Sequence, residues 1–296
     1  MRRTLLTASV FCVLGVVGVA AAQAPHHDDD PDEGQAPTAS AAASSAKPKV
    51  VRVSVPEKDG MLRVPGGTFT MGSSDKRAAE GERPAHKVTV PPFWIDRTEV
   101  TVEAYRACVE RKACKEPPKT SELCTYATKE RDLPISCVPF ESAASFCRAA
   151  GKRLPREAEW ELAARGTQSI RYPWGAPGSH CGYAATLRHD ATGKTCTDGH
   201  PARVGSYPSG ASPYGVLDLA GNVEEWTDDV FDGPPRVVSP TLPVGLAPTH
   251  PGPNHVLRGG SWLLPPSFAR TTARNWGSAL EAGPGVGFRC AKDATP

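Results

Sequence analysis

Alternating apolar and polar residues predict several short strands along this chain. Within residues 64–72 a Pro-Gly-Gly turn leads into an alternating run, and residues 87–90 form a second candidate. A period of two is typical of a strand with one buried face. Residues 256–258 and 286–290 are two further short runs, so we expect strands dispersed through the sequence.

Apolar residues that recur at helical spacing predict three helices. The first begins after Thr101, whose hydroxyl is suited to cap a helix N-terminus. The second covers about residues 141–150 and ends at Gly151, and the third opens at Pro155 and stops at Gly166. Helices followed by short strands and loops indicate an α+β domain with little regular secondary structure.

Composition narrows the class of protein. Of the 296 residues, 28 are Gly and 30 are Pro, so many turns are expected. Hydrophobic residues make up 39 %, which is enough for a packed core and excludes disorder throughout. The 34 Lys and Arg nearly balance the 32 Asp and Glu, whereas nucleic-acid-binding proteins concentrate positive charge. We therefore expect no nucleic-acid partner.

The N-terminus has the layout of a secretory signal peptide over residues 1–22. Two arginines precede an apolar stretch that ends in three alanines, which predicts cleavage after Ala22. An uncleaved membrane anchor is the alternative, because the stretch is just long enough to cross a bilayer. Residues 23–50, rich in Pro, Ala, Ser and Asp, predict a flexible linker, and residues 51–296 predict the folded domain. After cleavage we expect no membrane span, and a periplasmic, extracellular or surface location in a bacterium.

Eight cysteines remain once Cys12 is removed with the signal peptide: Cys108, Cys114, Cys124, Cys137, Cys147, Cys181, Cys196 and Cys290. An even number in an exported protein predicts four disulfides. A structural zinc site is the alternative, but no Cys-x-x-Cys pair is present. If all eight pair, no thiol is left to act as a nucleophile or a copper ligand.

Six motifs occur in the sequence, in this order: Val-Pro-Gly-Gly-Thr-Phe-Thr-Met-Gly (64–72), Ile-Asp-Arg-Thr-Glu-Val-Thr (95–101), Gly-Lys-Arg-Leu-Pro-Arg-Glu-Ala-Glu-Trp-Glu (151–161), Gly-Asn-Val-Glu-Glu-Trp (221–226), Arg-Gly-Gly-Ser-Trp (258–262) and Gly-Phe-Arg-Cys (287–290). Together they resemble the formylglycine-generating enzyme family, also called sulfatase-modifying factors. The resemblance covers about residues 61–292. It implies a variant of the C-type lectin-like fold and a disulfide between Cys147 and Cys290.

The copper chemistry of that family requires two cysteines that this chain lacks. Formylglycine-generating enzymes oxidise a cysteine of a client sulfatase, using two thiolates that hold Cu(I) just after the Gly-Gly-Ser-aromatic motif. The nearest equivalents here are Leu264 and Ala269, and no cysteine occurs between His255 and Arg289. We therefore expect no copper and no copper-dependent oxidase activity, as in a pseudoenzyme.

A second enzymatic branch similar to this family binds iron through histidines supplied mostly by a separate helical domain. In the position of that helical domain, this chain has only a low-complexity linker. Its domain histidines are scattered: His86, His180, His189, His200, His250 and His255. Iron is therefore not expected; three distant histidines that converge in the fold are the alternative.

The resemblance also implies a calcium site around the Gly-Asn-x-x-Glu-Trp motif. Its ligands would be the side chains of Asp218 and Glu225 and the carbonyls of Gly221 and Val223. Carboxylates and carbonyls suit this hard cation, which takes about six to eight oxygen ligands. The alternative is a capped turn closed by packing of Trp226, without a metal.

Five residues near the presumed substrate groove are candidates for ligand binding: Arg258, Ser261, Trp262, Arg270 and Arg274. Guanidinium groups there are suited to bidentate binding of a carboxylate or another anion. We favour the interpretation that most of these arginines are structural and pair with internal carboxylates such as Glu157, Glu159 or Asp218. We expect at least four of the six tryptophans to lie in the core, because large aromatics dominate buried area.

These observations leave competing functional hypotheses. The favoured one is an exported, calcium-stabilised module that binds a peptide or glycan of the cell envelope without catalysis. The second is an enzyme with a different metal centre, such as a non-heme iron oxygenase or a protein-modifying factor. A third, formylglycine generation by unrelated cysteines, would need Cys181 and Cys196 as free thiols. The absence of the copper-binding cysteines favours the binding module, because a chain can keep a family's fold without its activity.

Overall fold

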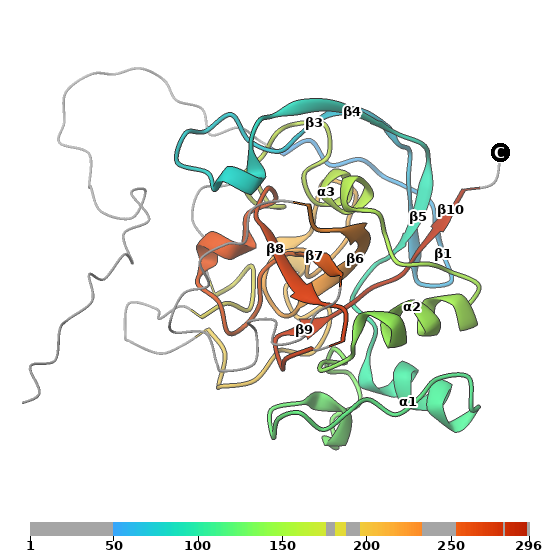
Figure 1. The fold of residues 1–296 in the computed structure, drawn as a ribbon. Helices are drawn as coiled ribbons and strands as arrows, with labels where there is room; N and C mark the ends of the chain where they lie inside the picture. The colour runs from blue at the N-terminus through green and yellow to red at the C-terminus, as the bar shows by residue number, and fades with distance from the viewer. Residues whose placement is uncertain (1–49, 176–180, 188–195, 233–252, 281, 295–296) are drawn as a thin grey trace, which may run out of the picture. The chain divides into compact units, whose positions relative to one another are not determined.

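The computed structural model describes residues 50–175, 181–187, 196–232, 253–280 and 282–294 (Figure 1). The predicted signal peptide and nearly all of the predicted linker lie outside these residues. Three α-helices occur in the described part: α1 (Val102–Glu110), α2 (Phe140–Ala149) and α3 (Glu157–Arg165). None of its helices has the length and apolar character needed to cross a membrane.

The strands of the described part form three sheets. The first has the order β1-β2-β5-β10 and is antiparallel, with β1 (Glu57–Lys58), β2 (Met61–Val64), β5 (Phe93–Asp96) and β10 (Ala291–Asp293). The second pairs β3 (Gly67–Met71) with β4 (His86–Val90). The third has the order β8-β7-β6-β9, with β6 (Glu224–Val230), β7 (Asn254–Arg258), β8 (Arg274–Ser278) and β9 (Val286–Gly287). In this sheet β6 and β9 run parallel, and the other pairs are antiparallel.

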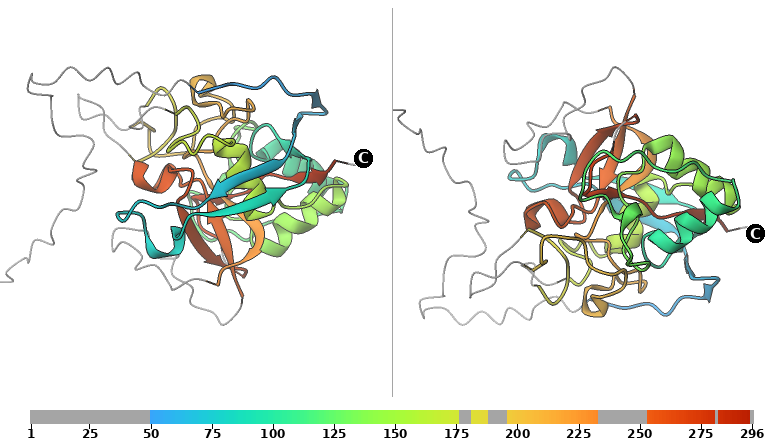
Figure 2. Two further views of the ribbon diagram at one scale, coloured as in Figure 1. Left: turned by 90° about the horizontal axis from the view of Figure 1, so that it is seen from above. Right: turned by 90° about the horizontal axis from the view of Figure 1, so that it is seen from below.

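Short 3₁₀ helices connect these elements: η1 (Glu80–Glu82), η2 (Thr125–Ala127), η3 (Pro208–Gly210) and η4 (Pro266–Ala269). Helix α3 packs against both the β3–β4 ribbon and strands β6 and β7 (Figure 1). Helices α1 and α2 lie side by side (Figure 2). The mixture of few helices and many short strands confirms the predicted α+β class.

The predicted helix ends are set by local chemistry. The Thr101 hydroxyl accepts a hydrogen bond from the Ala104 N–H at 3.1 Å and caps α1. After α2, Gly151 has a φ of +68°, and the Lys152 N–H donates to the Cys147 carbonyl at 2.8 Å. This is a Schellman ending, for which glycine is favoured because it has no Cβ. The third helix begins at Glu157, two residues later than predicted.

Apolar side chains form two large core clusters. One contains α1, α2 and Trp226, and the other contains β2, β5 and α3 with Trp160. Five of the six tryptophans are buried: Trp160, Trp174, Trp226, Trp262 and Trp276. This confirms that at least four belong to the core.

Four disulfides link the eight cysteines of the domain: Cys108–Cys114, Cys124–Cys137, Cys147–Cys290 and Cys181–Cys196. The third is the pairing that the resemblance implied. It joins α2 to the segment between β9 and β10, across 143 residues of sequence. Because Cys181 and Cys196 pair with each other, the hypothesis that required them as free thiols is wrong.

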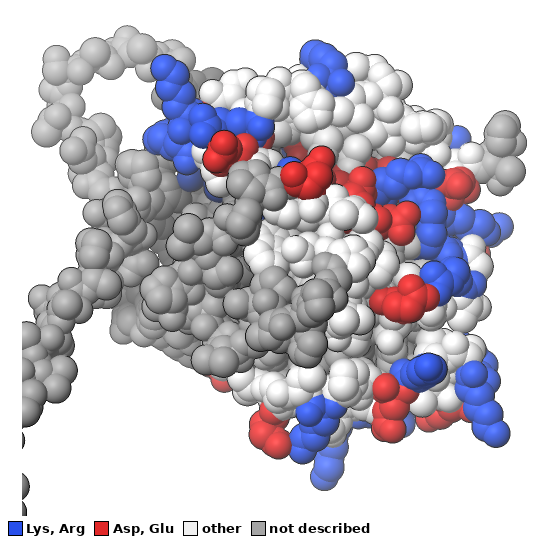
Figure 3. Space-filling view, viewed as in Figure 1, with Lys and Arg blue, Asp and Glu red and all other residues white. Residues whose placement is uncertain are grey.

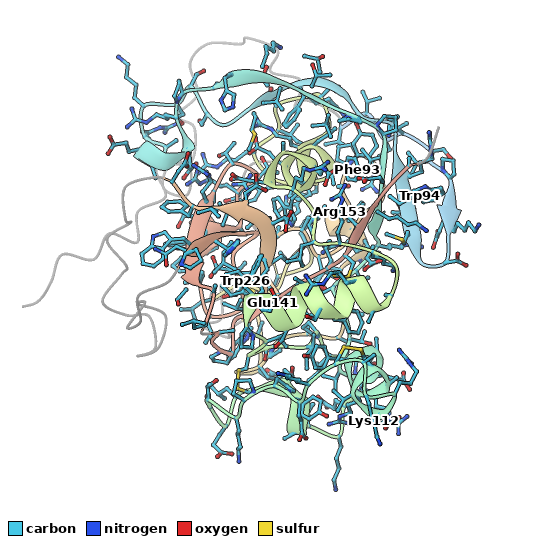
Figure 4. All side chains as sticks on the ribbon, turned by 45° about the vertical axis from the view of Figure 1, so that its right-hand side comes forward. Phe93, Trp94, Lys112, Glu141, Arg153 and Trp226 are labelled. Carbon is cyan, nitrogen blue, oxygen red and sulfur yellow. A yellow bond between two sulfur atoms is a disulfide. The ribbon has the colours of Figure 1, made fainter. Side chains whose placement is uncertain are left out.

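An ion-pair cluster around Arg153 joins α3 to β10 (Figure 4). Its Nη1 lies 2.7 Å from Glu159 Oε2, and its Nε donates to Asp293 at 3.1 Å. Its backbone N–H donates to Ala291 of β10. One side chain thus fixes the start of α3 against the first sheet.

Two strand predictions differ from the structure. Of the run predicted at residues 286–290, only β9 is a strand, while residues 288–290 are irregular and β10 begins after them and pairs with β5 in another sheet. Strand β6 was not predicted, because its sequence Glu-Glu-Trp-Thr-Asp-Asp-Val does not alternate. Its first four residues are buried together, so tertiary packing rather than pattern decides its conformation.

Surface charge on the face in Figure 3 is mixed. Lysine and arginine alternate with aspartate and glutamate along its right-hand and lower edges, beside an uncharged central area. This distribution agrees with the near-zero net charge of the sequence.

Candidate functional site

The turn before β6 has a strained backbone that fixes the predicted calcium ligands. Asp218, Gly221 and Asn222 all have positive φ, at 58°, 76° and 64°. A Cβ on Gly221 would lie 2.1 Å from the Ala185 carbonyl oxygen, so glycine is required there. The Asn222 N–H donates to that same carbonyl at 2.7 Å.

Asp218 has one satisfied and one unsatisfied carboxylate oxygen. Oδ2 accepts a hydrogen bond from the Gly205 N–H at 2.6 Å. Oδ1 is buried without a partner, and the residue is 6 % exposed. An unsatisfied buried oxygen of this kind costs free energy unless a proton or cation binds it.

The Glu225 carboxylate accepts hydrogen bonds from the Arg289 guanidinium and the Trp160 indole. Arg289 Nε donates to Oε2 and Nη2 donates to Oε1, both at 2.7 Å. The Trp160 indole also donates to Oε2, at 2.9 Å. Oε1 therefore carries one hydrogen bond and Oε2 carries two, which leaves a lone pair on Oε1 for a further ligand.

Glu99 is a third carboxylate at this place, and sequence reasoning did not single it out. It is 2 % exposed, no protein donor reaches its carboxylate oxygens, and its side chain lies within hydrogen-bonding reach of the Asp218 carboxyl, with which it can share a proton. Burial raises the pKa of Glu99 well above its usual value, and the charge of Asp218 raises it further. Burial also raises the pKa of Asp218, although the Gly205 N–H and the charge of Arg289 oppose that shift.

The donor set at this place is made of oxygen atoms, as a hard cation requires. The described residues contain no group of three His, Cys, Asp or Glu side chains that could hold a metal ion. Of the two side chains predicted to bind calcium, Asp218 has one carboxylate oxygen without a protein donor, and Glu225 is bound by Arg289 and Trp160.

The predicted groove residues lie largely in the interior. Arg258 is fully buried, and Ser261 and Trp262 are also buried. Arg258 Nη2 donates to Glu161 at 2.6 Å, and its guanidinium lies 5.1 Å from the Trp160 ring centre. Instead of facing a groove, this arginine joins β7 to α3.

The two remaining groove arginines are also matched by internal carboxylates. Arg270 donates to both oxygens of Glu82, at 2.7 and 2.9 Å. Arg274 donates to both oxygens of Glu157, at 2.6 and 2.9 Å. The structure thus confirms that these arginines pair with internal carboxylates, and their bidentate geometry is not open to an external anion.

The histidines of the described residues do not gather. His86 contacts the Pro84 carbonyl, His200 contacts the Pro201 carbonyl, and His255 is buried against the ring of Phe140. Burial lowers the pKa of His255. The other three candidates lie outside the described residues: His180, His189 and His250.

Comparison with known proteins identifies the family. The family model described as "Sulfatase-modifying factor enzyme 1-like domain" matches residues 46–294. The chain belongs to this family. It is 33 % identical to a formylglycine-generating enzyme of Streptomyces coelicolor, over 88 % of this chain and 96 % of that protein.

Relatives within this family carry different names. A hercynine oxygenase of Mycolicibacterium smegmatis is 31 % identical over 78 % of this chain and 60 % of that protein. The "Inactive C-alpha-formylglycine-generating enzyme 2" of Bos taurus is 30 % identical over 79 % of this chain and 88 % of that protein. Membership of this family therefore does not fix an activity.

Solved structures support the fold. PvdO from Pseudomonas aeruginosa matches with a TM-score of 0.61 and 27 % identity, over 79 % of this chain and 94 % of that one. Treponema denticola variable protein 1 matches with a TM-score of 0.54 and 20 % identity, over 79 % and 95 %. The chain has the C-type lectin-like variant predicted for this family.

The two residues that the sequence predicts at the positions of the family's copper cysteines are apolar. Leu264 and Ala269 are both buried, and Ala269 packs in a cluster with Tyr172 and Trp174. The rings of Tyr172 and Trp174 stack with centres 5.0 Å apart, and Tyr183 stacks on Trp174 at 5.3 Å. An aromatic stack thus lies beside one of the two positions where the family binds Cu(I).

Proposed function

We propose that this protein is an exported, calcium-stabilised member of the sulfatase-modifying factor family that binds a peptide or glycan of the cell envelope and does not oxidise cysteine with copper. The observation that carries this proposal is the absence of cysteine from residues 255–289, which removes both thiolates that the family uses for Cu(I). The other eight cysteines of the domain are consumed by disulfides.

Export is supported by the disulfides and by the signal-like N-terminus. Disulfides persist in oxidising compartments and are rare where thiols are kept reduced. Four in one domain, after an apolar stretch that ends in small residues, favour the periplasm or cell surface.

Calcium is supported by the unsatisfied oxygen of Asp218 and by the oxygen-rich turn that follows it. The proposed ligands are the side chains of Asp218 and Glu225 and the carbonyls of Gly221 and Val223. Calcium would supply structural stabilisation of the strained turn, with no part in a reaction.

Ligand binding is supported by the aromatic stack of Tyr172, Trp174 and Tyr183. Tyr172 and Trp174 are buried and Tyr183 is half-buried, so the Tyr183 end of the stack borders the surface. Aromatic faces with polar edges bind sugars and side chains at low conformational cost. A peptide or glycan of the envelope is therefore the ligand class that we propose.

An oxidase assay tests the proposal that the protein does not oxidise cysteine with copper. The purified protein is loaded with Cu(I), mixed with a cysteine-containing sulfatase peptide, and followed by oxygen consumption and peptide mass. The Streptomyces coelicolor relative serves as the positive control. We expect no oxygen uptake and an unchanged peptide mass; turnover comparable to the control would contradict the proposal.

A metal-dependent enzyme with another centre is the second candidate. It is favoured by the hercynine oxygenases among the relatives. Such an enzyme needs about three side-chain ligands around an open position. Stoichiometric iron in the purified protein, lost together with activity on chelation, would favour this candidate over the binding module.

A further inference from the structure

We infer that the outer face of the first sheet binds an acidic glycan through Arg63, Trp94 and Lys292. Trp94 of β5 lies directly opposite Arg63 of β2 on one side and Lys292 of β10 on the other. Residues paired in this way project from the same face of a sheet, with Cβ atoms about 5 Å apart, so one aromatic ring lies between two cations. The inference rests on the ligand-binding part of the proposed function, narrows the ligand to an acidic glycan, and assigns it a surface that does not include the aromatic stack.

This face of the sheet is directed away from the core. Along β5 the burial alternates: Phe93 and Ile95 pack in the interior, whereas Trp94 is half-buried. Arg63 is also half-buried, and Lys292 is exposed. Trp94 is the one tryptophan of the chain outside the core, and it lies on the right-hand side of the molecule in Figure 4.

The two cations beside Trp94 have no acidic partner among the described residues. The strands of this sheet contain three acidic residues, and each is paired with another cation: Glu57 with Arg97, Asp96 with Lys152, and Asp293 with Arg153. Two positive charges therefore remain on the outer face, whereas the arginines once expected in a groove are neutralised internally. An acidic ligand is complementary to these charges.

The Trp94 ring is available to a ligand as well. Within the described part of the chain it stacks on no aromatic ring, has no cation over its face, and its indole N–H has no acceptor. The core tryptophans differ: the Arg258 guanidinium lies 5.1 Å from the Trp160 ring centre, and the Trp226 indole donates to the Val138 carbonyl. A flat aromatic face suits a sugar ring, and a guanidinium group suits a carboxylate.

A glycan fits this surface better than a peptide. Extended peptides bind sheets through main-chain hydrogen bonds at a free edge strand, and helical peptides bind in apolar grooves. Strand β5 is paired on both sides, with β2 and β10, so its backbone offers no such bonds. A sugar ring needs none, because it stacks on the aromatic face while the flanking cations bind its acidic groups.

Calorimetric titration with a hyaluronan oligosaccharide, which carries uronic acid carboxylates, tests this inference. The full mature protein is titrated with this oligosaccharide and with its methyl-esterified form, which is uncharged. We expect the ester to bind at least about tenfold more weakly, since it loses the contacts with both cations. Added salt should weaken binding of the acidic form, because it screens exposed charges.

Matched variants assign the binding to these residues. Lys292→Gln removes one charge from the proposed surface, and Lys112→Gln removes one from an exposed lysine at the lower end of Figure 4, away from Trp94. We expect an affinity about threefold lower with a weaker salt dependence for Lys292→Gln, and no change for Lys112→Gln. Trp94→Ala should lower the affinity about tenfold, while Trp94→Phe keeps most of it because a flat ring remains.

The remaining outcomes separate this inference from the function on which it rests. If Lys292→Gln and Trp94→Ala bind the oligosaccharide as tightly as the wild type, the glycan binds elsewhere, so the proposed function stands and the inference is wrong. Binding of a poly-glutamate peptide without binding of the oligosaccharide would overturn the glycan in favour of a peptide. If the wild type binds neither, the inference is wrong. Should Trp94→Ala fail to fold, Arg63→Gln replaces it, with an expected loss of about threefold; an unchanged affinity would contradict the inference.

Discussion

Arg289 and Glu225 form a fully buried, bidentate ion pair in which both N–O distances are 2.7 Å. Arg289 belongs to the Gly-Phe-Arg-Cys motif and Glu225 to the Gly-Asn-x-x-Glu-Trp motif, so the pair joins two motifs that are distant in sequence. Breaking such a pair leaves an uncompensated charge in the interior.

We predict that Arg289→Ala lowers the free energy of unfolding by about 3–5 kcal/mol. Arg131→Ala is the control, because Arg131 and its partner Glu103 are both exposed, and it should change stability by less than about 1 kcal/mol. Urea unfolding followed by tryptophan fluorescence measures both values. Equal, small effects would show that the buried pair does not support the fold.

The disulfide between Cys147 and Cys290 should stabilise the protein more than the one between Cys108 and Cys114. The sequence separations are 143 and 6 residues, and the chain-entropy model gives about 5 and about 2.4 kcal/mol for loops of these sizes. Paired Cys→Ser variants of each disulfide, compared by urea unfolding, measure the difference. A larger loss from the short disulfide would contradict this prediction.

Stability in calcium-free buffer should fall as the pH rises. The folded-state pKa values of Glu99 and Asp218 are raised by burial, so the folded state binds more protons than the unfolded state above the unfolded pKa values, near pH 4. The stabilisation is thus complete below about pH 4 and is lost as the pH increases through the folded-state values. Thermal unfolding in a chelator from pH 4 to 8 measures this trend, and Glu99→Gln should weaken it.

Excess calcium should oppose this trend, because Ca²⁺ binds the deprotonated Asp218 carboxylate and stabilises the folded state by mass action. We predict that added Ca²⁺ raises the melting temperature at pH 8 more than at pH 4. A calcium effect that does not depend on pH would show that Asp218 is not its ligand.

Restoring the missing thiols should create Cu(I) binding. We predict that Leu264→Cys combined with Ala269→Cys binds one Cu(I) under anaerobic conditions, because two thiolates suit this soft ion. The matched Ser–Ser double variant should bind none. Competition with a chromophoric Cu(I) chelator measures the affinity; failure of the Cys–Cys variant would show that these positions do not match the family's copper ligands.

Locally determined features could be predicted from the sequence. The Thr101 cap, the glycine endings of α2 and α3, and the Pro-Gly-Gly turn before β3 depend on residues within a few positions of one another. The interactions that stabilise these features lie within short segments, so the local sequence is enough to predict them.

Features that depend on distant contacts could not be predicted in this way. Strand β6 begins with two glutamates, which are disfavoured in strands, and is buried because Asn275 and Arg289 satisfy them. Arg258 pairs with an internal carboxylate, as the sequence favoured, but its partner Glu161 could not be predicted, because the packing of β7 on α3 determines it. Glu99 lies within the family motif at residues 95–101, but the neighbouring sequence does not reveal that the Asp218 carboxyl lies beside it in the fold.

Elemental analysis of the purified mature protein by mass spectrometry, with a free-thiol count on the same sample, tests the central claim most directly. The account predicts about one calcium per chain, no iron or copper, and no free thiol. Stoichiometric iron or copper, or two reactive thiols, would contradict the binding module and favour an enzyme.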